Sequence, residues 1–404
     1  MTSLSLHYAL GAALLPSALL ASLASASGLR HEPPVEPQAP QSQPTPQPAA
    51  RPSGGPALPG FLLGGRPESA PATASRPSDL RAKGEEKHLA SLVQLTFGGQ
   101  NAEGYFSFDD RRIIFQSTRP PYECDQIFSM NLEGSEVSLL STGTGKTTCA
   151  YFFPDGQRVL FASTHAAGPE CPPRPDYSKG YVWRVEPTFD IYTANADGTG
   201  LKPLVQQPGY DAEATISRDG KKIVFTSDRD GDLELYSMNA DGTGVTRLTF
   251  APGYDGGAFF SFDGTKIIYR AFHTSDEKVL AENRELLKQG LVRPTTMDLY
   301  VMDADGKNVR QVTKLGGASF APFLHPDGKR VIFSTNHHDK DPKGREFDLF
   351  LVNLDGTGLE QVTFSAQFDG FPMWTSDGKR LVFASNRHGA APRDTNLFLA
   401  EWKD

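Results

Sequence analysis

Residues 216–249 read ISRDGKKIVFTSDRDGDLELYSMNADGTGVTRLT, and this stretch contains two tight hairpins in succession. Asp-Gly pairs separate runs of alternating or β-branched apolar residues, a strong hairpin signal because Asp and Gly tolerate positive φ. The first hairpin pattern recurs at 106–118, 152–164, 260–272, 324–336 and 374–386. Its turn aspartates lie at positions 109, 155, 219, 263, 327 and 377, so successive turns are 46, 64, 44, 64 and 50 residues apart. Six four-stranded units at this spacing, two of them with insertions, predict a β-propeller of six blades.

The two ends of the repeat array are complementary. The sixth unit stops after its third strand, at residues 396–400, and lacks the usual outer strand. A matching strand stands at the start of the array, at residues 92–96, which read LVQLT. We expect it to complete the last blade, because a closed ring leaves no unpaired strand edge. The predicted fold is all-β: a six-bladed propeller closed by its N-terminal strand, with a short helical insertion in blade four.

The repeats resemble the PD40 (WD40-like) repeats of TolB-like β-propellers. The family pattern is roughly SPDG, two basic residues, an apolar strand and S-x-R-D-G, followed by I-Y-x-M-N-x-D-G and L-T. Residues 217–249 match it almost letter for letter. The resemblance covers residues 92–404 and implies the six-bladed fold rather than one activity, because such rings serve unrelated functions. A proline-rich tract precedes the repeats in this chain, where TolB itself carries an α/β domain.

The first 90 residues differ in composition from the repeats. Residues 8–23 form an apolar run too short for a comfortable membrane span, and a small-residue cleavage site, ASA, follows at 24–26. This pattern predicts a secretory signal peptide over 1–26. Residues 27–90 are rich in Pro, Ala, Gln, Ser and Gly, which predicts a disordered linker because such a tract buries little apolar surface. We expect the propeller to occupy residues 91–404 and to be periplasmic or secreted.

Charge restricts the class of partner. Residues 91–404 carry 33 Lys and Arg against 42 Asp and Glu, which argues against nucleic-acid binding, because that requires a basic surface. No other long apolar run is present in the sequence, so we expect a mature protein without a membrane span. A monomer that binds a protein or a cell-envelope ligand is the expected arrangement.

One position of each repeat carries a cationic or imidazole side chain, four residues beyond the aromatic that ends the second strand: Arg119, His165, Arg229, His273, His337 and Arg387. The entrance to each inner strand, eight residues before the turn aspartate, holds Asn101, Thr147, Asp211, Asp255, Ser319 and Asp369, and two residues further on lie Glu103 and Glu213. Both positions share the face opposite the Asp-Gly turns. A ligand site of these cations with Asp211, Glu213, Asp255 and Asp369 is therefore predicted there. Alternatively, the arginines pair with the acids and join adjacent blades.

The three histidines of this set raise the question of a metal. Neutral imidazole and carboxylate groups are suitable ligands for a transition metal, so His165, His273 and His337 are candidate ligands if they converge. Our main expectation is a protein without a cofactor.

Two insertions of about twenty residues belong to the same face. The first, 166–188, carries Tyr181 and Trp183, which either stack on a ligand or pack the loop onto the rim. The second, 274–293, opens with TSDE and, before Gly290, places five residues on one largely apolar face: Val279, Leu280, Asn283, Leu286 and Leu287. It predicts an amphipathic helix of about three turns that covers the mouth as a lid.

Three cysteines, Cys124, Cys149 and Cys171, gather on this face in the blade alignment. In an exported protein they favour one disulfide with one thiol left over, and Cys124–Cys171 is the preferred pair.

Nucleophile elbows, HExxH motifs and phosphate-binding loops do not occur in the sequence. The leading hypothesis is a non-catalytic, exported propeller that binds a protein or cell-envelope ligand on its lidded face. The alternative is a metal-assisted polysaccharide lyase or hydrolase that uses His165, His273 and His337.

Overall fold

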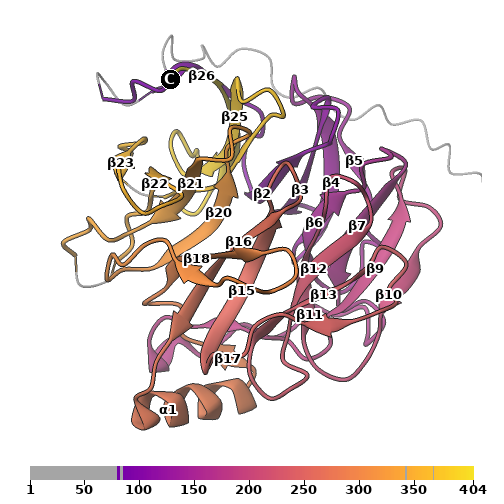
Figure 1. Cartoon of the computed structure of the whole chain (residues 1–404). Helices are drawn as coiled ribbons and strands as arrows, with labels where there is room; N and C mark the ends of the chain where they lie inside the picture. Colours follow the sequence, from indigo (N-terminus) through magenta and orange to yellow (C-terminus); the bar gives the residue numbers. More distant parts are fainter. Residues whose placement is uncertain (1–79, 82–84, 342–343, 367) are drawn as a thin grey trace, which may run out of the picture. The chain divides into compact units, whose positions relative to one another are not determined.

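The computed structural model describes residues 80–81, 85–341, 344–366 and 368–404 (Figure 1). The predicted signal peptide and residues 27–79 and 82–84 of the predicted linker lie outside the described residues. The regular elements of the described chain are six four-stranded antiparallel sheets, one two-stranded sheet, one α-helix and one short 3-10 helix, η1 (Tyr177–Lys179). The predicted six-bladed, all-β propeller is confirmed. Among the described helices, none has the length and apolarity that crossing a bilayer requires.

Each blade contains three strands of six to eight residues and an outer strand. From the axis outward, blade one contains β2 (Gln100–Phe106), β3 (Arg112–Thr118), β4 (Gln126–Asn131) and β5 (Ser138–Leu139). Blade two contains β6 (Thr147–Phe152), β7 (Arg158–Ser163), β9 (Asp190–Asn195) and β10 (Lys202–Val205). Blade three contains β11 (Asp211–Ile216), β12 (Lys222–Ser227), β13 (Glu234–Asn239) and β14 (Thr246–Arg247). Blade four contains β15 (Gly253–Phe260), β16 (Lys266–His273), β18 (Asp298–Asp303) and β19 (Arg310–Gln311). Blade five contains β20 (Ser319–Leu324), β21 (Arg330–Thr335), β22 (Asp348–Asn353) and β23 (Glu360–Gln361). Blade six contains β24 (Asp369–Trp374), β25 (Arg380–Ser385), β26 (Asn396–Trp402) and β1 (Leu89–Gln94).

The Asp-Gly turns between the first and second strands are held by side chains of the repeat itself. In blade three the Ser217 hydroxyl donates to Asp219 Oδ1 at 2.7 Å, and the same oxygen accepts from the backbone N–H of Lys221 at 3.1 Å. Gly220 takes the positive φ, 72°, that the turn needs. These local bonds explain why the short motif recurs in every blade.

The core lies within and between the blades. The aromatic residue at the fourth position of each second strand is fully buried in all six blades: Phe115, Phe161, Phe225, Tyr269, Phe333 and Phe383. Burial of an aromatic side chain of this size contributes about 1.5–3 kcal/mol, so the repeated aromatic is a main source of stability.

The ring closes through its N-terminal strand. β1 pairs antiparallel with β26, with Leu92 opposite Ala400 and Val93 opposite Leu399. The strand begins at Leu89, earlier than the predicted start at residue 92, and strands from both ends of the repeat array therefore form blade six.

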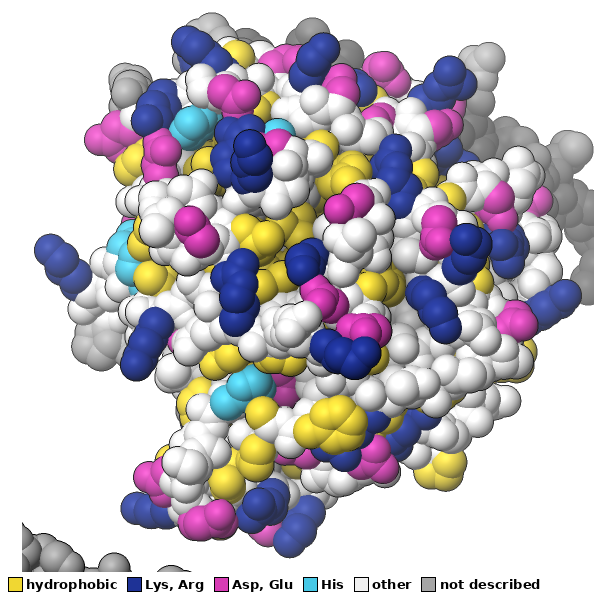
Figure 2. Space-filling view, in the orientation of Figure 1, with side chains coloured by type: hydrophobic (Ala, Val, Ile, Leu, Met, Phe, Trp, Pro, Cys, Tyr) yellow, Lys and Arg dark blue, Asp and Glu magenta, His cyan; other side chains and the backbone are white. Residues whose placement is uncertain are grey.

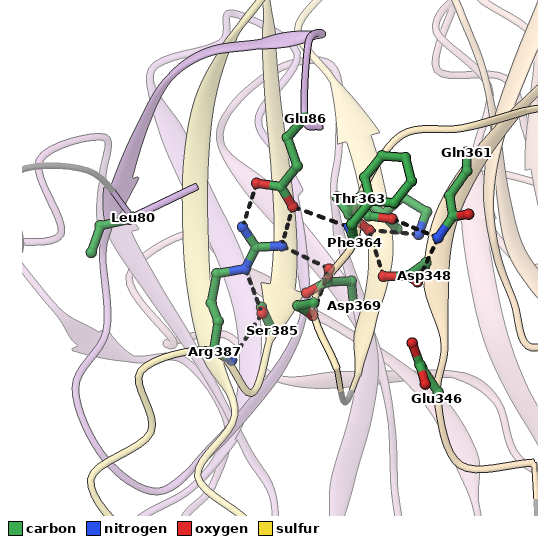
Figure 3. Close-up of polar contacts among 12 residues, drawn as sticks. Leu80, Glu86, Glu346, Asp348, Gln361, Thr363, Phe364, Asp369, Ser385 and Arg387 are labelled. Atoms are coloured by element: carbon green, nitrogen blue, oxygen red, sulfur yellow. Dashed lines mark hydrogen bonds and ion pairs between the residues drawn. The ribbon is translucent and has the colours of Figure 1, made fainter. Parts of the chain in front are cut away.

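Residues 85–90, which were assigned to the linker, pack against blade six. The Glu86 carboxylate is buried and accepts two hydrogen bonds from the Arg387 guanidinium, at 3.0 and 2.8 Å (Figure 3). Arg387 also donates to Asp369 at 2.7 Å, so one guanidinium lies between two buried carboxylates. The composition of the segment predicted disorder, but this ion pair and the strand that follows it order the segment against the propeller.

The two insertions form one unit, which we call the cap (residues 166–188 and 274–295). Its two-stranded sheet pairs β8 (Trp183–Arg184) of the first insertion with β17 (Leu291–Val292) of the second. Helix α1 (Glu277–Lys288) begins after Asp276, whose carboxylate accepts from the backbone N–H of Lys278 at 2.9 Å. In Figure 1 it lies beside β17, and its Leu286 packs with Val182 and Leu291. The sequence predicted that both insertions lie on one face but not that they contact each other, whereas the structure joins them through a shared sheet and core.

Basic and acidic side chains are interspersed over the face of the propeller shown in Figure 2. This face presents a mixed surface rather than a continuous patch of one sign.

Candidate functional site

Every innermost strand has a β-bulge at the same place. The strand register shifts there in all six blades, between Ala212 and Thr215 in blade three, for example. The residue six positions before each turn aspartate adopts positive φ, and these six residues form what we call the bulge ring: Glu103, Cys149, Glu213, Gly257, Ala321 and Phe371. A bulge re-aims a side chain relative to a regular strand. All six residues line a small cavity of about 40 Å³ at the axis of the propeller.

A chamber of about 1090 Å³ lies between the bulge ring and the cap. Its floor contains Glu103, Cys149 and Glu213 together with Arg270 of β16. Tyr177, Tyr181, Trp183 and Arg184 of the cap form one wall. The adjoining wall contains four phenylalanines of blades five and six whose ring centroids lie 5.2–6.4 Å apart: Phe320, Phe347, Phe368 and Phe371. The Phe320 ring also contacts that of Trp183, with centroids 6.2 Å apart.

Arg270 crosses the floor from blade four. Its guanidinium forms an ion pair with Glu213, and its Nε and Nη2 donate to the Tyr254 hydroxyl at 3.1 and 2.6 Å. The guanidinium carbon lies 5.2 Å from the ring of Trp183, so Arg270 also links the floor to the cap. Burial alone would lower the pKa of Arg270, but Glu213 and Tyr254 raise it above its ordinary value, and the group stays charged.

Gly257 makes room for that guanidinium. A Cβ added at residue 257 would lie 1.8 Å from Arg270 Nη1, and the residue has φ of +58°. The backbone N–H of Gly257 donates to Glu213 Oε2 at 2.9 Å, and the Thr226 hydroxyl donates to the same oxygen at 2.7 Å. Both oxygens of Glu213 are therefore bonded within the protein.

Glu103 lacks such partners. Within the described residues its one recorded bond is from the Cys149 thiol, 3.8 Å from Oε1, and it has no ion pair. Burial, with the negative charge of Glu213 adding to it, raises the pKa of Glu103 to about 7. Burial also raises the pKa of the Cys149 thiol well above its usual range, so the thiol is protonated at neutral pH.

An aromatic layer closes the axis below the bulge ring. The rings of Tyr105, Tyr151, Phe259 and Phe323 contact one another with centroids 5.4–6.1 Å apart. A ligand in the chamber therefore meets the floor at the bulge ring.

The six predicted cations and imidazoles, which we call the loop ring, pack inside their own blades. In blade three, Arg229 Nη2 donates to Asp211 Oδ1 at 2.7 Å, and the guanidinium lies 5.1 and 4.7 Å from the rings of Phe225 and Tyr236. Both partners belong to the same blade, so these pairs do not join adjacent blades as one interpretation of the sequence had it. The equivalent pairs are Arg119 with Asn101 at 2.6 Å and Arg387 with Asp369 at 2.7 Å.

The three histidines of the loop ring also pack inside their own blades. Each packs at a steep angle against the aromatic residue of the third strand of its own blade: His165 against Tyr192, His273 against Tyr300 and His337 against Phe350, with centroids 4.4–4.7 Å apart. His273 Nε2 also lies 2.9 Å from Asp255 Oδ1. They do not form the predicted metal group, because their ring nitrogens do not come together in any described set of three ligand atoms within 4.8 Å of one another.

A different group brings possible metal ligands together. Of the described residues, one set of three His, Cys or carboxylate side chains has its ligand atoms within 4.8 Å of one another: His338, Glu346 and Asp348. Burial, with the charge of Asp369 adding to it, raises the pKa of Asp348 to about 8. Asp348 already accepts hydrogen bonds from Gln361 and Thr363, which anchor the outer strand of blade five (Figure 3).

Three of the predicted ligand-binding residues line the chamber: Glu213, Tyr181 and Trp183. The others are absent from its lining and pack within their blades: Arg119, His165, Arg229, His273, His337, Arg387, Asp211, Asp255 and Asp369. Sequence reasoning missed Arg270 and Gly257, and it considered Cys149 only as a thiol. One signal in the sequence could have pointed to the bulge ring: the residue six positions before each turn aspartate differs in type from blade to blade.

Cys124 and Cys171 form a disulfide, with their Cα atoms 5.9 Å apart, which is the pair that the sequence favoured. It ties the first insertion to the loop of blade one and leaves Cys149 as a free thiol.

Comparisons with known proteins agree with this fold. Residues 174–298 match the family model of the PD40 TolB β-propeller domain. A protein described as TolB from Agrobacterium tumefaciens is 18% identical with a TM-score of 0.52, over 76% of this chain and 91% of that one. TolB from Acinetobacter baumannii is 16% identical with a TM-score of 0.50, over 76% of this chain and 65% of that one.

A gluconolactonase from Xanthomonas campestris is 13% identical with a TM-score of 0.51, over 78% of this chain and 91% of that one. No curated protein matches the sequence. At these identities the likeness to solved structures concerns the fold, and the residues of the chamber must carry any statement about function.

Proposed function

Because this chain is a TolB-like six-bladed β-propeller with PD40 repeats, we propose that it is an exported, non-catalytic binding protein that takes part of a protein or cell-envelope ligand into the chamber under its cap. The carrying observation is the chamber itself, a cavity of about 1090 Å³ with aromatic walls and a polar floor. Ligand sites in proteins have this size and this mixture of apolar walls with few polar groups.

The cap wall supports binding. Tyr177 and Tyr181 are 57% and 56% exposed, although large aromatic residues are usually buried. Exposed aromatic rings on a fixed loop offer contact area at a low cost in side-chain entropy. Arg345 and Arg393 of the chamber lining have no ion pair among the described residues and are therefore available to a ligand.

Export is supported by two features. The predicted signal peptide is the first, and the Cys124–Cys171 disulfide is the second, because disulfides persist in oxidising compartments. A periplasmic or secreted location follows from the proposal.

The residues of the floor favour binding over chemistry. A protonated thiol is a weak nucleophile, and Cys149 has a carboxyl group rather than an imidazole as its neighbour. The alternative, a metal-assisted lyase or hydrolase that uses His165, His273 and His337, requires these side chains to leave their packed positions.

Site-specific photo-cross-linking in the exported, full-length protein tests the proposal. A benzophenone side chain at Tyr177 is placed in the chamber, and the same group at Lys221, in the Asp-Gly turn of blade three, is the control on the opposite face. We expect a discrete adduct from position 177 and none from position 221. Equal adducts from both positions, no adduct from 177, or turnover of a polysaccharide by the purified protein would overturn the proposal.

A further inference from the structure

We infer that the floor of the chamber is a recognition site for a cationic group, the side chain of a lysine or arginine in a peptide segment of the partner, with Glu103 as its counter-ion. This inference rests on the proposed function, since it names the chemistry that the chamber selects.

The molecule contains its own example of such a contact. Glu213 and Glu103 occupy equivalent positions of the bulge ring, in blades three and one. Glu213 holds the guanidinium of Arg270, which also contacts the Tyr254 hydroxyl and the face of Trp183. A carboxylate, a hydroxyl and an aromatic face are what a buried cation needs. This floor is therefore already able to hold one guanidinium.

Glu103 occupies the position in blade one that Glu213 occupies in blade three, but no arginine pairs with it among the described residues. Its recorded partner in the described chain is the Cys149 thiol at 3.8 Å, a weak donor, and it lines both the small axial cavity and the chamber above. The residue equivalent to Arg270 in blade one is Gln116, whose Oε1 is occupied by Thr148 Oγ1 and by the backbone N–H of Cys149, at 2.5 and 3.2 Å. Blade one therefore supplies a carboxylate but no positive charge.

The charge of the floor is unbalanced as a result. At the floor two carboxylates, Glu103 and Glu213, face one guanidinium, that of Arg270, while the rest of the chamber lining also contains Lys146, Arg184, Arg345 and Arg393. An unpaired carboxylate in a desolvated site is costly, and a ligand cation removes that cost when it binds. The aromatic layer beneath, which includes Tyr105, prevents the ligand from passing further and adds a ring close to the cation.

The walls favour a peptide as the carrier of this cation. The four phenylalanines of blades five and six, Phe320, Phe347, Phe368 and Phe371, present a broad apolar surface beside the floor. Such a surface accommodates the apolar side chains of a peptide, and the cap adds Tyr181 and Trp183, whose ring contacts that of Phe320. The expected ligand is a segment with a basic residue next to a large apolar one.

Calorimetry with short probes on the full-length protein tests the inference. The probe is N-acetyl-Phe-Lys-amide, and its ε-acetylated form is the neutral control. We expect the charged probe to bind at least tenfold more tightly than the neutral one, and Glu103→Gln to abolish that difference. Glu282→Gln, an exposed position on the cap helix, removes the same charge elsewhere and should change nothing. Thermal unfolding of both variants verifies that they fold.

Three results would contradict the inference. They are equal binding of the two probes, a Glu103→Gln variant that keeps its preference for the charged probe, and a Glu103-dependent response to glucosamine that exceeds the response to the peptide. If the adduct from position 177 forms while the lysine probe does not bind, the cationic site is refuted and the binding function stands. If neither occurs, both are refuted.

Discussion

The loop ring and the bulge ring each place one residue per blade on the same face of the propeller, yet they serve different purposes. The loop ring has the same chemistry in every blade: an arginine or histidine packed against the aromatic residues of its own sheet. The bulge ring has Glu, Cys, Glu, Gly, Ala and Phe at equivalent positions. A contact that all six repeats make alike stabilises the repeat, whereas positions that differ between blades can form an asymmetric site on the axis.

Removal of a loop-ring cation should have the largest effect. Arg387→Met leaves the carboxylates of Glu86 and Asp369 buried without their counter-ion. We expect the free energy of unfolding to fall by about 3–5 kcal/mol, as measured by urea denaturation. Arg284→Met, at an exposed position on α1, is the control and should stay within about 0.5 kcal/mol of the parent protein. A loss below 1 kcal/mol for Arg387→Met would show that the loop ring contributes little to stability.

Glu103 of the bulge ring should make the free energy of unfolding depend on pH. The pKa of Glu103 is raised to about 7, above the value of the unfolded chain, through burial and the charge of Glu213, opposed by the Cys149 hydrogen bond and by Arg270. The protonated carboxyl is therefore favoured in the folded state, and stability is lost as the pH rises from about 4.5 through 7. We expect Glu103→Gln to gain about 2–3 kcal/mol relative to the parent protein between pH 5 and pH 8. Parallel stability curves of the two proteins would contradict this prediction.

A smaller effect should distinguish two reasons for a glycine at position 257: the room that Arg270 needs and the positive φ of the backbone. Gly257→Ala and Gly264→Ala both add a Cβ at positive φ, but open space surrounds residue 264, whereas Arg270 lies against residue 257. Each should lose about 1–2 kcal/mol for the conformation, and Gly257→Ala about 1–3 kcal/mol more for the displaced guanidinium. Equal unfolding free energies for the two variants would mean that Arg270 relocates without cost.

The smallest effect is expected for a loop-ring histidine. His337 packs edge-on against Phe350, and its Nδ1 has no partner among the described residues although it is buried. His337→Phe keeps an aromatic ring there and should change the unfolding free energy by less than about 1 kcal/mol. Binding of the lysine probe should also be unchanged. Loss of a stoichiometric transition metal from this variant, measured by elemental mass spectrometry, would instead revive the metal-dependent alternative.

The candidate site was only partly visible in the sequence. Tyr181, Trp183 and Glu213 were identified because aromatic residues in an insertion and extra carboxylates near the inner strands stand out against the repeat. The histidines and arginines of the loop ring stood out equally, but their partners lie within the same blade, and the sequence does not show which aromatic ring a side chain will stack on. Arg270 was missed because it follows the buried Tyr269 inside an ordinary strand.

The sequence by itself determined the number of blades, the Asp-Gly turns and the complementarity of the two ends, because these depend on local hydrogen bonds and on a period that repeats six times. The tertiary structure alone decided the rest. The bulges turn one residue of each inner strand toward the axis, Gly257 admits Arg270 to Glu213, and the two insertions pair through β8 and β17 into one cap. The contacts of Glu213 with Gly257 and Arg270 and the pairing of β8 with β17 join residues far apart in the chain, and no local pattern encodes the distance between them.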